Sequence, residues 1–209
     1  PKVALFVGGE LDWFTTDFDY FVGVDRACLR LLELGLPIDL AVGDFDSVSR
    51  SELEMIQSAA KDCMIAPAEK DDTDTELALK IIFQLYSEAE VTIFGAFGGR
   101  IDHMLSNIFL VSDPELAPFM RCICLRDKQN KITYYPEGSH KVLPEPGMTY
   151  VSFLHEGDGK LTILGAKYEL TSVNYFQKKI YSSNEFVDGP IQVLVPNGYV
   201  IVIQTKDRS

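Results

Sequence analysis

The sequence lacks long apolar runs and has few basic residues, and each absence excludes a class of protein. No run reaches the roughly 18 apolar residues that a membrane-spanning helix requires, so we expect no such helix. The 19 Lys and Arg residues against 31 Asp and Glu residues give a net charge of −12. Because nucleic acids and anionic membranes are bound through basic surface, neither is an expected partner.

Cysteine is also scarce, and the four cysteines have no spacing typical of a zinc site. We expect reduced, buried thiols in a cytoplasmic protein at Cys28, Cys63, Cys122 and Cys124. The segment Pro1–Gly9 lacks the basic region of a signal peptide and leads directly into an apolar run, which predicts a strand.

Short apolar runs alternate with helical patterns in the first half of the chain. Buried strands are expected at residues 3–7, 21–24, 38–42, 63–66 and 91–94. Helices are expected at residues 25–34, 75–86 and 101–111, and capping-box spacings at 51–54 and 73–76 mark two helix starts. This alternation predicts a mostly parallel α/β sheet covered by helices on both faces.

The pattern changes near residue 121, after which turn residues separate short strands and no helix is expected. Strands are predicted at residues 132–135, 141–143, 150–153, 160–164, 167–170, 191–195 and 199–204. Asn197-Gly198, between the last two, predicts a hairpin. The expected fold class is therefore α/β plus all-β, with an α/β domain at residues 1–127 and an antiparallel β-sandwich or open barrel at residues 128–209.

Two acidic segments follow expected strands, namely Gly43-Asp44-Phe45-Asp46-Ser47 and Lys70-Asp71-Asp72-Thr73-Asp74. Parallel strands end at one rim of a sheet, where two like charges 4 Å apart cost roughly 4 kcal/mol at an effective dielectric near 20. A divalent cation removes this cost, and oxygen ligands favour Mg²⁺ with a phosphate chain. The metal-ligand candidates are Asp44, Asp46, Asp71 and Asp74, with Asp72 a bystander. The alternative is that these residues only form turns and cap helices.

A glycine-rich segment, Gly95–Arg100, follows the fifth expected strand. Its backbone N–H groups and the Arg100 guanidinium suit a phosphate, although a tight packing turn is the alternative and the P-loop motif is absent. Asp102 either caps the next helix or accepts a proton or hydrogen bonds from a substrate, whereas His103 alone is more often structural. Asp25 either caps a helix or reaches a ribose or metal. The polar segment Tyr181–Phe186 either lines a small-molecule pocket or is an ordinary loop.

In this order along the chain, these segments resemble bacterial thiamine pyrophosphokinases. The matching residues are Val24-Asp25-Arg26-Ala27, Pro37–Ser47 with its Gly-Asp-Phe-Asp-Ser, Lys70–Glu76, Gly98-Gly99-Arg100-Ile101-Asp102-His103 and Ser182-Ser183-Asn184-Glu185. The resemblance covers nearly the whole chain, including the change from α/β to all-β. The family pattern often has glycine after the acid at position 25, where this chain has Arg26-Ala27.

The resemblance implies an enzyme that transfers the diphosphate of ATP to thiamine, giving thiamine diphosphate and AMP with Mg²⁺. It also implies a homodimer that holds thiamine in a cleft between subunits. Metal and ATP phosphates would be surrounded by Asp44, Asp46, Asp71 and Asp74. Asp25 and Arg100 would contact the nucleotide, with Arg100 on phosphate.

Thiamine itself would lie near Asp102, the first candidate for a general base, and near Ser183 and Asn184. Tyr199 is a loose match to an aromatic residue that stacks on thiamine in some relatives. Asp71, Arg100 and Asp102 are thus the expected catalytic residues, since positioning and charge neutralisation dominate phosphoryl transfer.

Two other classes of function use the same residues. In a phosphohydrolase of the haloacid-dehalogenase type, Asp44 would be a nucleophile and Asp46 an acid. The Asp-Phe-Asp-Ser sequence and the second, all-β half oppose that interpretation. A non-catalytic nucleotide sensor would bind ATP through the same contacts, and turnover distinguishes it from an enzyme.

Overall fold

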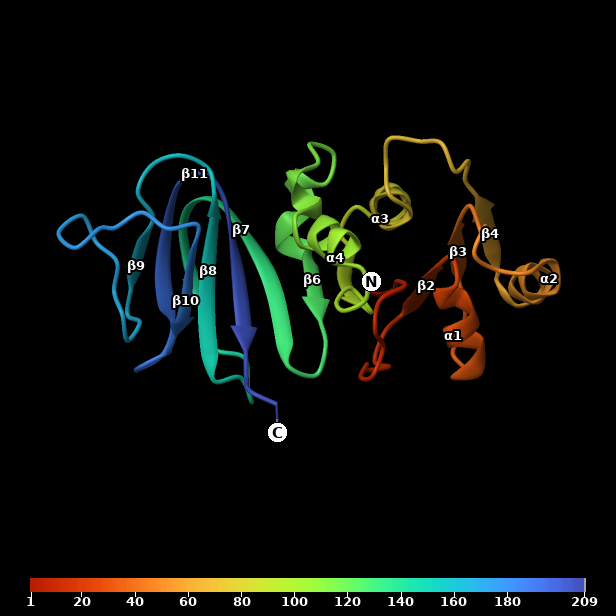
Figure 1. Ribbon diagram of the computed structural model, residues 1–209, viewed down its shortest axis with the longest axis horizontal. Coiled ribbons are helices and arrows are strands. Elements are labelled where there is room, and N and C mark those ends of the chain that lie inside the picture. Colours follow the sequence, from red (N-terminus) through yellow and green to blue (C-terminus); the bar gives the residue numbers. More distant parts are fainter. Residues whose placement is uncertain (209) are drawn as a thin grey trace. The chain divides into compact units, whose positions relative to one another are not determined.

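Six strands in the first part of the computed structural model, which describes residues 1–208, form a parallel sheet (Figure 1). The strands are β1 (Lys2–Phe6), β2 (Tyr20–Val24), β3 (Leu40–Gly43), β4 (Asp62–Ile65), β5 (Glu90–Phe94) and β6 (Ile123–Arg126). Their order is β6-β5-β1-β2-β3-β4, with every neighbouring pair parallel. Strand order reverses between β1 and β5, so ligand-binding loops are expected at the carboxyl ends near this point.

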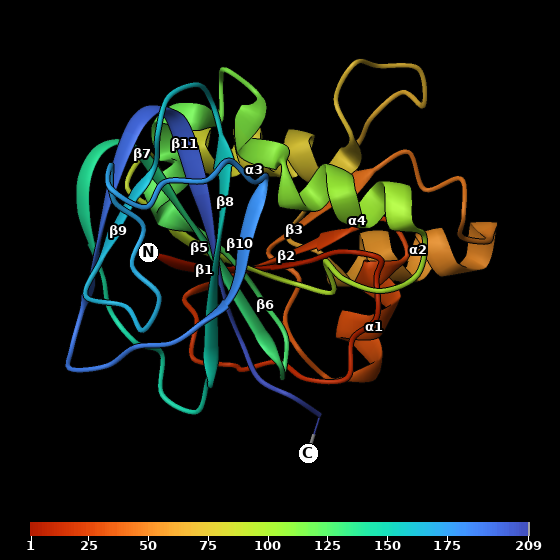
Figure 2. The same cartoon turned by 60° about the vertical axis from the view of Figure 1, so that its left-hand side comes forward.

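Helices cover both faces of this sheet, as predicted. They are α1 (Ala27–Glu33), α2 (Arg50–Ala59), α3 (Asp74–Leu85) and α4 (Ile101–Ile108). Figures 1 and 2 show α1 and α3 on opposite faces of the strands. Alternate strand residues such as Ala4 and Phe6 pack with Cys28 and Leu31 of α1 and Ile56 of α2 in one buried cluster. The period-two alternation of the strands therefore directs one set of side chains to each helical layer.

The helix starts were only partly predicted. Thr73 caps α3, since its Oγ1 accepts from the Glu76 N–H at 3.1 Å and the Glu76 carboxylate accepts from the Thr73 N–H at 3.2 Å. The capping box of α2 was placed wrongly at residues 51–54, because Ser49 is the capping residue and pairs with Glu52. The helix predicted over 101–111 ends at Ile108 and is followed by 3-10 segments, Leu110–Ser112 and Ala117–Cys122.

The second part of the chain is an antiparallel β structure, as the change of pattern predicted. Its strands are β7 (Asn130–Val142), β8 (Tyr150–Glu156), β9 (Thr162–Leu164), β10 (Ile180–Asn184) and β11 (Ile191–Thr205). β11 pairs with β7 along its whole length, with β8 through residues 199–205 and with β9 through residues 192–194. A buried cluster of aliphatic and aromatic side chains, including Phe153, Ile163, Val193 and Val202, forms its core.

The predicted hairpin at Asn197-Gly198 is wrong, because residues 191–195 and 199–204 belong to one strand, β11. Both β7 and β11 carry a proline and a glycine at the same level, and Gly138 lies opposite Val195 while Pro136 lies opposite Tyr199. Residues 196–198 lie opposite Glu137 alone and form a bulge, at which β11 changes its second partner from β9 to β8. Turn residues here bend a continuous strand and do not reverse the chain.

Four further features complete the description of the two parts. Contacts within the chain divide it into two compact units, Pro1–Lys128 and Gln129–Ser209. Residues 167–170, predicted as a strand, contribute a single bridge between Leu170 and Ile163. All four cysteines are free thiols. Within residues 1–208, no helix has the length and apolar character needed to span a membrane.

Candidate metal and phosphate site

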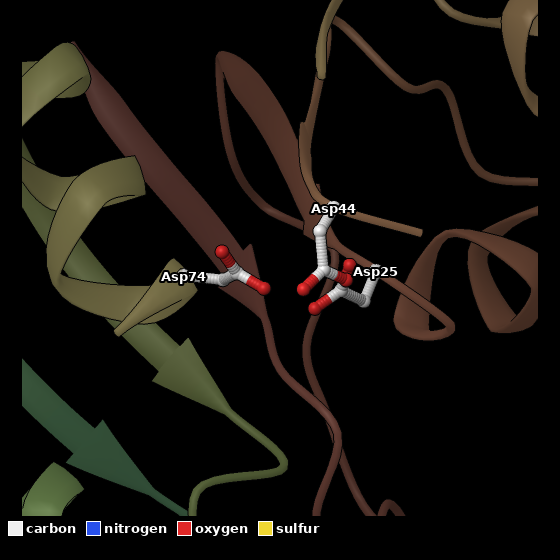
Figure 3. A group of neighbouring side chains, drawn as sticks. All are labelled: Asp25, Asp44 and Asp74. Atoms are coloured by element: carbon white, nitrogen blue, oxygen red, sulfur yellow. The ribbon is translucent and has the colours of Figure 1, made fainter. Parts of the chain in front are cut away.

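Three aspartates from three different elements of the first unit bring their carboxylates together. Asp25 follows β2, Asp44 follows β3 and Asp74 is the first residue of α3. Oxygen atoms of the three side chains lie within 4.8 Å of one another, and all three side chains are half-buried. Figure 3 shows the carboxylates pointing toward a common centre. The parallel sheet thus delivers residues far apart in sequence to one point at its carboxyl rim.

The backbone at this rim is adapted to the carboxylates. Asp25 and Phe45 have positive φ angles of 49° and 57°, which are uncommon for residues other than glycine. The Phe45 N–H donates to Asp25 Oδ1 at 2.9 Å, and the Asp25 N–H donates to the Val42 carbonyl at 2.9 Å. Gly43, with φ of 151°, lies against the Asp25 carboxylate, where a Cβ atom would collide with it. The Asp25 carboxylate, which is part of the site, therefore stabilises the unusual backbone conformation of Phe45.

The three carboxylates do not share charge equally. Burial and a hydrogen bond with Asp74 raise the pKa of Asp25 to about 8, so Asp25 carries a proton at neutral pH. Burial also acts against ionisation of Asp74, but the hydrogen bond from Asp25 and the ion pair with Lys70 outweigh it and lower the pKa of Asp74. One proton is thus held between two carboxylates that would otherwise repel each other.

A lysine of the β4–α3 loop enters the same cluster. Lys70 Nζ lies 2.6 Å from Asp74 Oδ1, and the two side chains are only 16% and 14% exposed. Nζ also donates to the Pro67 carbonyl at 3.0 Å. Sequence reasoning assigned no role to Lys70, because its loop has no regular period that would predict which carboxylate it meets.

These residues fit a divalent cation. Carboxylate oxygens are hard ligands suited to Mg²⁺, and three of them converge here from separate elements. A proton on Asp25 and the ammonium of Lys70 together offset only part of the negative charge that the fold collects. Asp25, Asp44 and Asp74 are accordingly the residues that would hold the metal.

A second group of carboxylates among the described residues, Asp72, Glu76 and Asp113, has a different character. Lys80 of α3 lies 2.8 Å from both Asp72 and Asp113, and 2.8 Å from Glu115 as well. Burial acts to lower the pKa of Lys80, but the hydrogen bonds that its ammonium donates to Asp113, Asp72 and Glu115 outweigh burial and raise the pKa. An internal cation already pairs with two of these three carboxylates, so we assign the group a structural role that ties α3 to the segment after α4.

The chain also matches known protein families over most of its length. Residues 12–123 match the model described as "Thiamin pyrophosphokinase, catalytic domain", and residues 139–200 match "Thiamin pyrophosphokinase, vitamin B1 binding domain". The chain belongs to the thiamine pyrophosphokinase family. Members of this family are transferases that make thiamine diphosphate.

Individual members of the thiamine pyrophosphokinase family show the same relationship. The thiamine pyrophosphokinase of Bacillus subtilis is 33% identical over 202 residues, covering 95% of this chain and 92% of the relative. The crystal structure of a thiamin pyrophosphokinase family protein from Enterococcus faecalis is 45% identical, with a TM-score of 0.92 and full coverage of both chains. The yeast thiamin pyrophosphokinase structure, at 16% identity and a TM-score of 0.77 over 98% of this chain and 86% of its own, shares the fold.

Two aspartates that the family resemblance placed at the metal lie outside the group of three. Asp46 is exposed but adjacent, and its N–H donates to Asp44 Oδ1 at 3.1 Å. A side-chain hydrogen bond with Asp44 raises the pKa of Asp46. Asp71 is exposed on the β4–α3 loop, and the structure does not include it in the cluster. The third aspartate of the group is Asp25. The sequence feature that pointed to it was its position directly after a predicted strand.

Arg100 and Asp102 pair with each other at the start of α4. Two guanidinium nitrogens donate to the two Asp102 oxygens at 2.6 and 3.1 Å, and both side chains are exposed. The hydrogen bond from Arg100 lowers the pKa of Asp102, and the His103 N–H adds to the effect. A lowered pKa makes Asp102 a weaker proton acceptor while this pair is formed, and its role as a general base stays a prediction.

The residues expected to meet thiamine in the second unit differ in availability. Ser183 is exposed on β10 with φ of 60°, and its N–H donates to Ser152 Oγ at 3.1 Å. Asn184 is 4% exposed, and its amide bonds the Tyr168 N–H and carbonyl at 2.9 and 2.8 Å. Asn184 therefore holds a loop within this unit, and its contact with thiamine stays a prediction. Tyr199 is buried beside Tyr134 and does not offer an exposed ring face.

Proposed function

We propose that this protein transfers the terminal diphosphate of ATP to the hydroxyl of thiamine, giving thiamine diphosphate and AMP. The observation that carries the proposal is the convergence of Asp25, Asp44 and Asp74 at the carboxyl rim of the sheet, in a chain that belongs to the thiamine pyrophosphokinase family. Such a rim is where open α/β sheets place nucleotide phosphates.

Mg²⁺ is the proposed cofactor, and when bound it supplies charge neutralisation for the transferred diphosphate and the departing AMP. Asp25, Asp44 and Asp74 would hold it, with Asp46 and Asp71 reaching it or its water ligands from the exposed loops. The hydroxyl of thiamine attacks the β-phosphorus of ATP, so the alignment of the two substrates decides the rate. These aspartates therefore act by positioning and by balancing charge.

Arg100 and Asp102 form the next part of the proposed site. The guanidinium of Arg100 would bind a phosphate with two donors, which requires it to leave its exposed pair with Asp102. Asp102 would then accept a hydrogen bond from thiamine and orient it. Once Arg100 has left, the hydrogen bond that lowers the pKa of Asp102 is lost, so Asp102 remains the first candidate to take the hydroxyl proton.

We further propose a division of labour between the two parts of the chain and a homodimeric, cytoplasmic enzyme. The α/β domain, residues 1–127, would bind ATP and metal, and the β domain, residues 128–209, would bind thiamine through Ser183 and Asn184. Exposed apolar side chains on α4 support association with a second copy, which would complete a thiamine site between subunits. Four free thiols are consistent with a reducing compartment.

The experiment is a product analysis with ATP, Mg²⁺ and thiamine. We expect AMP and thiamine diphosphate to form in equal amounts, with no ADP, because the diphosphate moves as one group. A phosphohydrolase would release phosphate without thiamine, and a nucleotide sensor would give no turnover. Either result would overturn the proposal.

Two substitutions test the residues. We expect Asp44→Asn and Asp71→Asn to lower turnover by about 100-fold or more, equivalent to ~3 kcal/mol of transition-state stabilisation. Circular dichroism and thermal unfolding should show a folded protein in both cases. Near-normal rates in both variants would mean that the acidic loops serve only as turns and caps.

A further inference from the structure

We propose that Lys70 is an exchangeable cation, which holds Asp74 until a divalent metal displaces it and then binds the phosphates of the nucleotide. The inference rests on the proposed function, since it concerns the order of events at the same site. It assigns a positioning role to a lysine that neither the sequence motifs nor the group of three aspartates had singled out.

The first step in the argument is the contact itself. Lys70 Nζ is 2.6 Å from Asp74 Oδ1, and both side chains are largely shielded from solvent. Asp74 also contributes an oxygen to the group of three within 4.8 Å, so ammonium and metal would compete for one carboxylate.

The second step is a comparison with Lys80, which also lies among carboxylates. Lys80 belongs to α3 and lies 2.8 Å from three carboxylates at once, so its release would leave all three without this cation. Lys70 instead lies on the loop between β4 and α3, where it contacts one carboxylate, that of Asp74, and the Pro67 carbonyl. A lysine on a loop with one ion pair can leave; a helical lysine with three cannot without loss of structure.

The third step concerns what each cation can bind. A divalent ion would be held by oxygens of all three aspartates, whereas the ammonium forms an ion pair with Asp74 alone. At a sufficient concentration of the metal, we therefore expect the metal to displace the Lys70 ammonium from Asp74. The released ammonium then lies beside the place where metal-bound phosphates gather, and phosphate oxygens are a suitable partner for it.

The test measures binding of Mn²⁺ alone, as a paramagnetic probe for Mg²⁺, with no nucleotide or thiamine present. We expect Lys70→Met to bind Mn²⁺ about tenfold more tightly than the parent protein, a change of ~1.4 kcal/mol. Lys70→Arg keeps the positive charge and should restore the parent affinity to within about threefold. The matched control is Lys61→Met, which removes a lysine paired with Asp39 outside the site and should leave Mn²⁺ affinity unchanged.

A second measurement tests whether the released lysine binds the phosphates of the nucleotide. With Mg²⁺ saturating, Lys70→Met should bind a non-hydrolysable ATP analogue about tenfold more weakly, while Lys61→Met should not differ from the parent. Unchanged or weaker Mn²⁺ binding by Lys70→Met would overturn the exchange, and unchanged affinity for the analogue would overturn the transfer to phosphate. Neither measurement needs turnover, so a failure of the parent protein to form AMP would refute the proposed function separately.

Discussion

At the scale of single residues, the site depends on residues with an unusual backbone conformation or protonation state. Gly43 leaves room for the Asp25 carboxylate, and that carboxylate in turn holds Phe45 at a positive φ angle through its N–H. The sequence allowed Asp44 and Asp74 to be proposed as ligands because acidic residues were concentrated beyond two strands. It left Asp25 ambiguous, since one aspartate before a helix is also an ordinary cap.

The shared proton on Asp25 leads to a prediction about pH. Because folding raises the pKa of Asp25 to about 8, the stabilisation from this proton is fully present below the ordinary carboxyl pKa and is lost as the pH rises through about 8. Asp25→Asn keeps an acceptor for the Phe45 N–H and supplies a permanent donor to Asp74. In EDTA we expect it to raise the melting temperature by about 2–4 °C at pH 9 and by much less at pH 5.5. An equal increase at both pH values would contradict the shared proton.

At the scale of elements, whether turn residues reverse the chain or only bend a strand depends on how the neighbouring strands pair. Asn197-Gly198 is typical of a hairpin, yet the pairing of β7 with β11 through both halves makes it a bulge. A local signal cannot reveal that two apolar runs continue along one neighbour. Five of the six parallel strands of the first unit were predicted to within about two residues, because each is an apolar run between turn residues and helices, whereas β6 was not predicted.

Lys80 gives a prediction for how α3 is held. Its ammonium links α3 to Asp72 before the helix and to Asp113 and Glu115 after α4. Lys80→Met would leave the Asp72 and Asp113 side chains, 27% and 14% exposed, without their cation. We expect a loss of about 2 kcal/mol in the free energy of unfolding, measured with urea at pH 7. Lys2→Met, which removes an exposed lysine paired with the 96% exposed Asp17, is the control and should change the free energy of unfolding far less.

At the scale of the whole molecule, one helix has an apolar face that nothing in the described chain covers. α4 has no buried residue, and its Ile101 and Leu105 side chains, one turn apart, are 69% and 45% exposed. Adjacent exposed apolar side chains on one helix face are typical of an interaction surface. The helix also begins with Arg100 and Asp102, so a partner on this face would lie beside the proposed thiamine contacts.

We therefore predict that α4 is part of the interface of the proposed homodimer. Leu105→Glu would place a charge in that interface. Removing water from this charge in the dimer costs free energy, whereas in the monomer the charge stays hydrated, so the substitution should favour the monomer. We expect this variant to elute as a monomer in size-exclusion chromatography with light scattering, with a matching loss of thiamine affinity. Met55→Glu, which changes a 57% exposed apolar side chain on α2, is the control and should remain dimeric. A dimer that persists in Leu105→Glu at micromolar concentration would exclude α4 from the interface, whereas a parent protein that is itself monomeric would refute the homodimer.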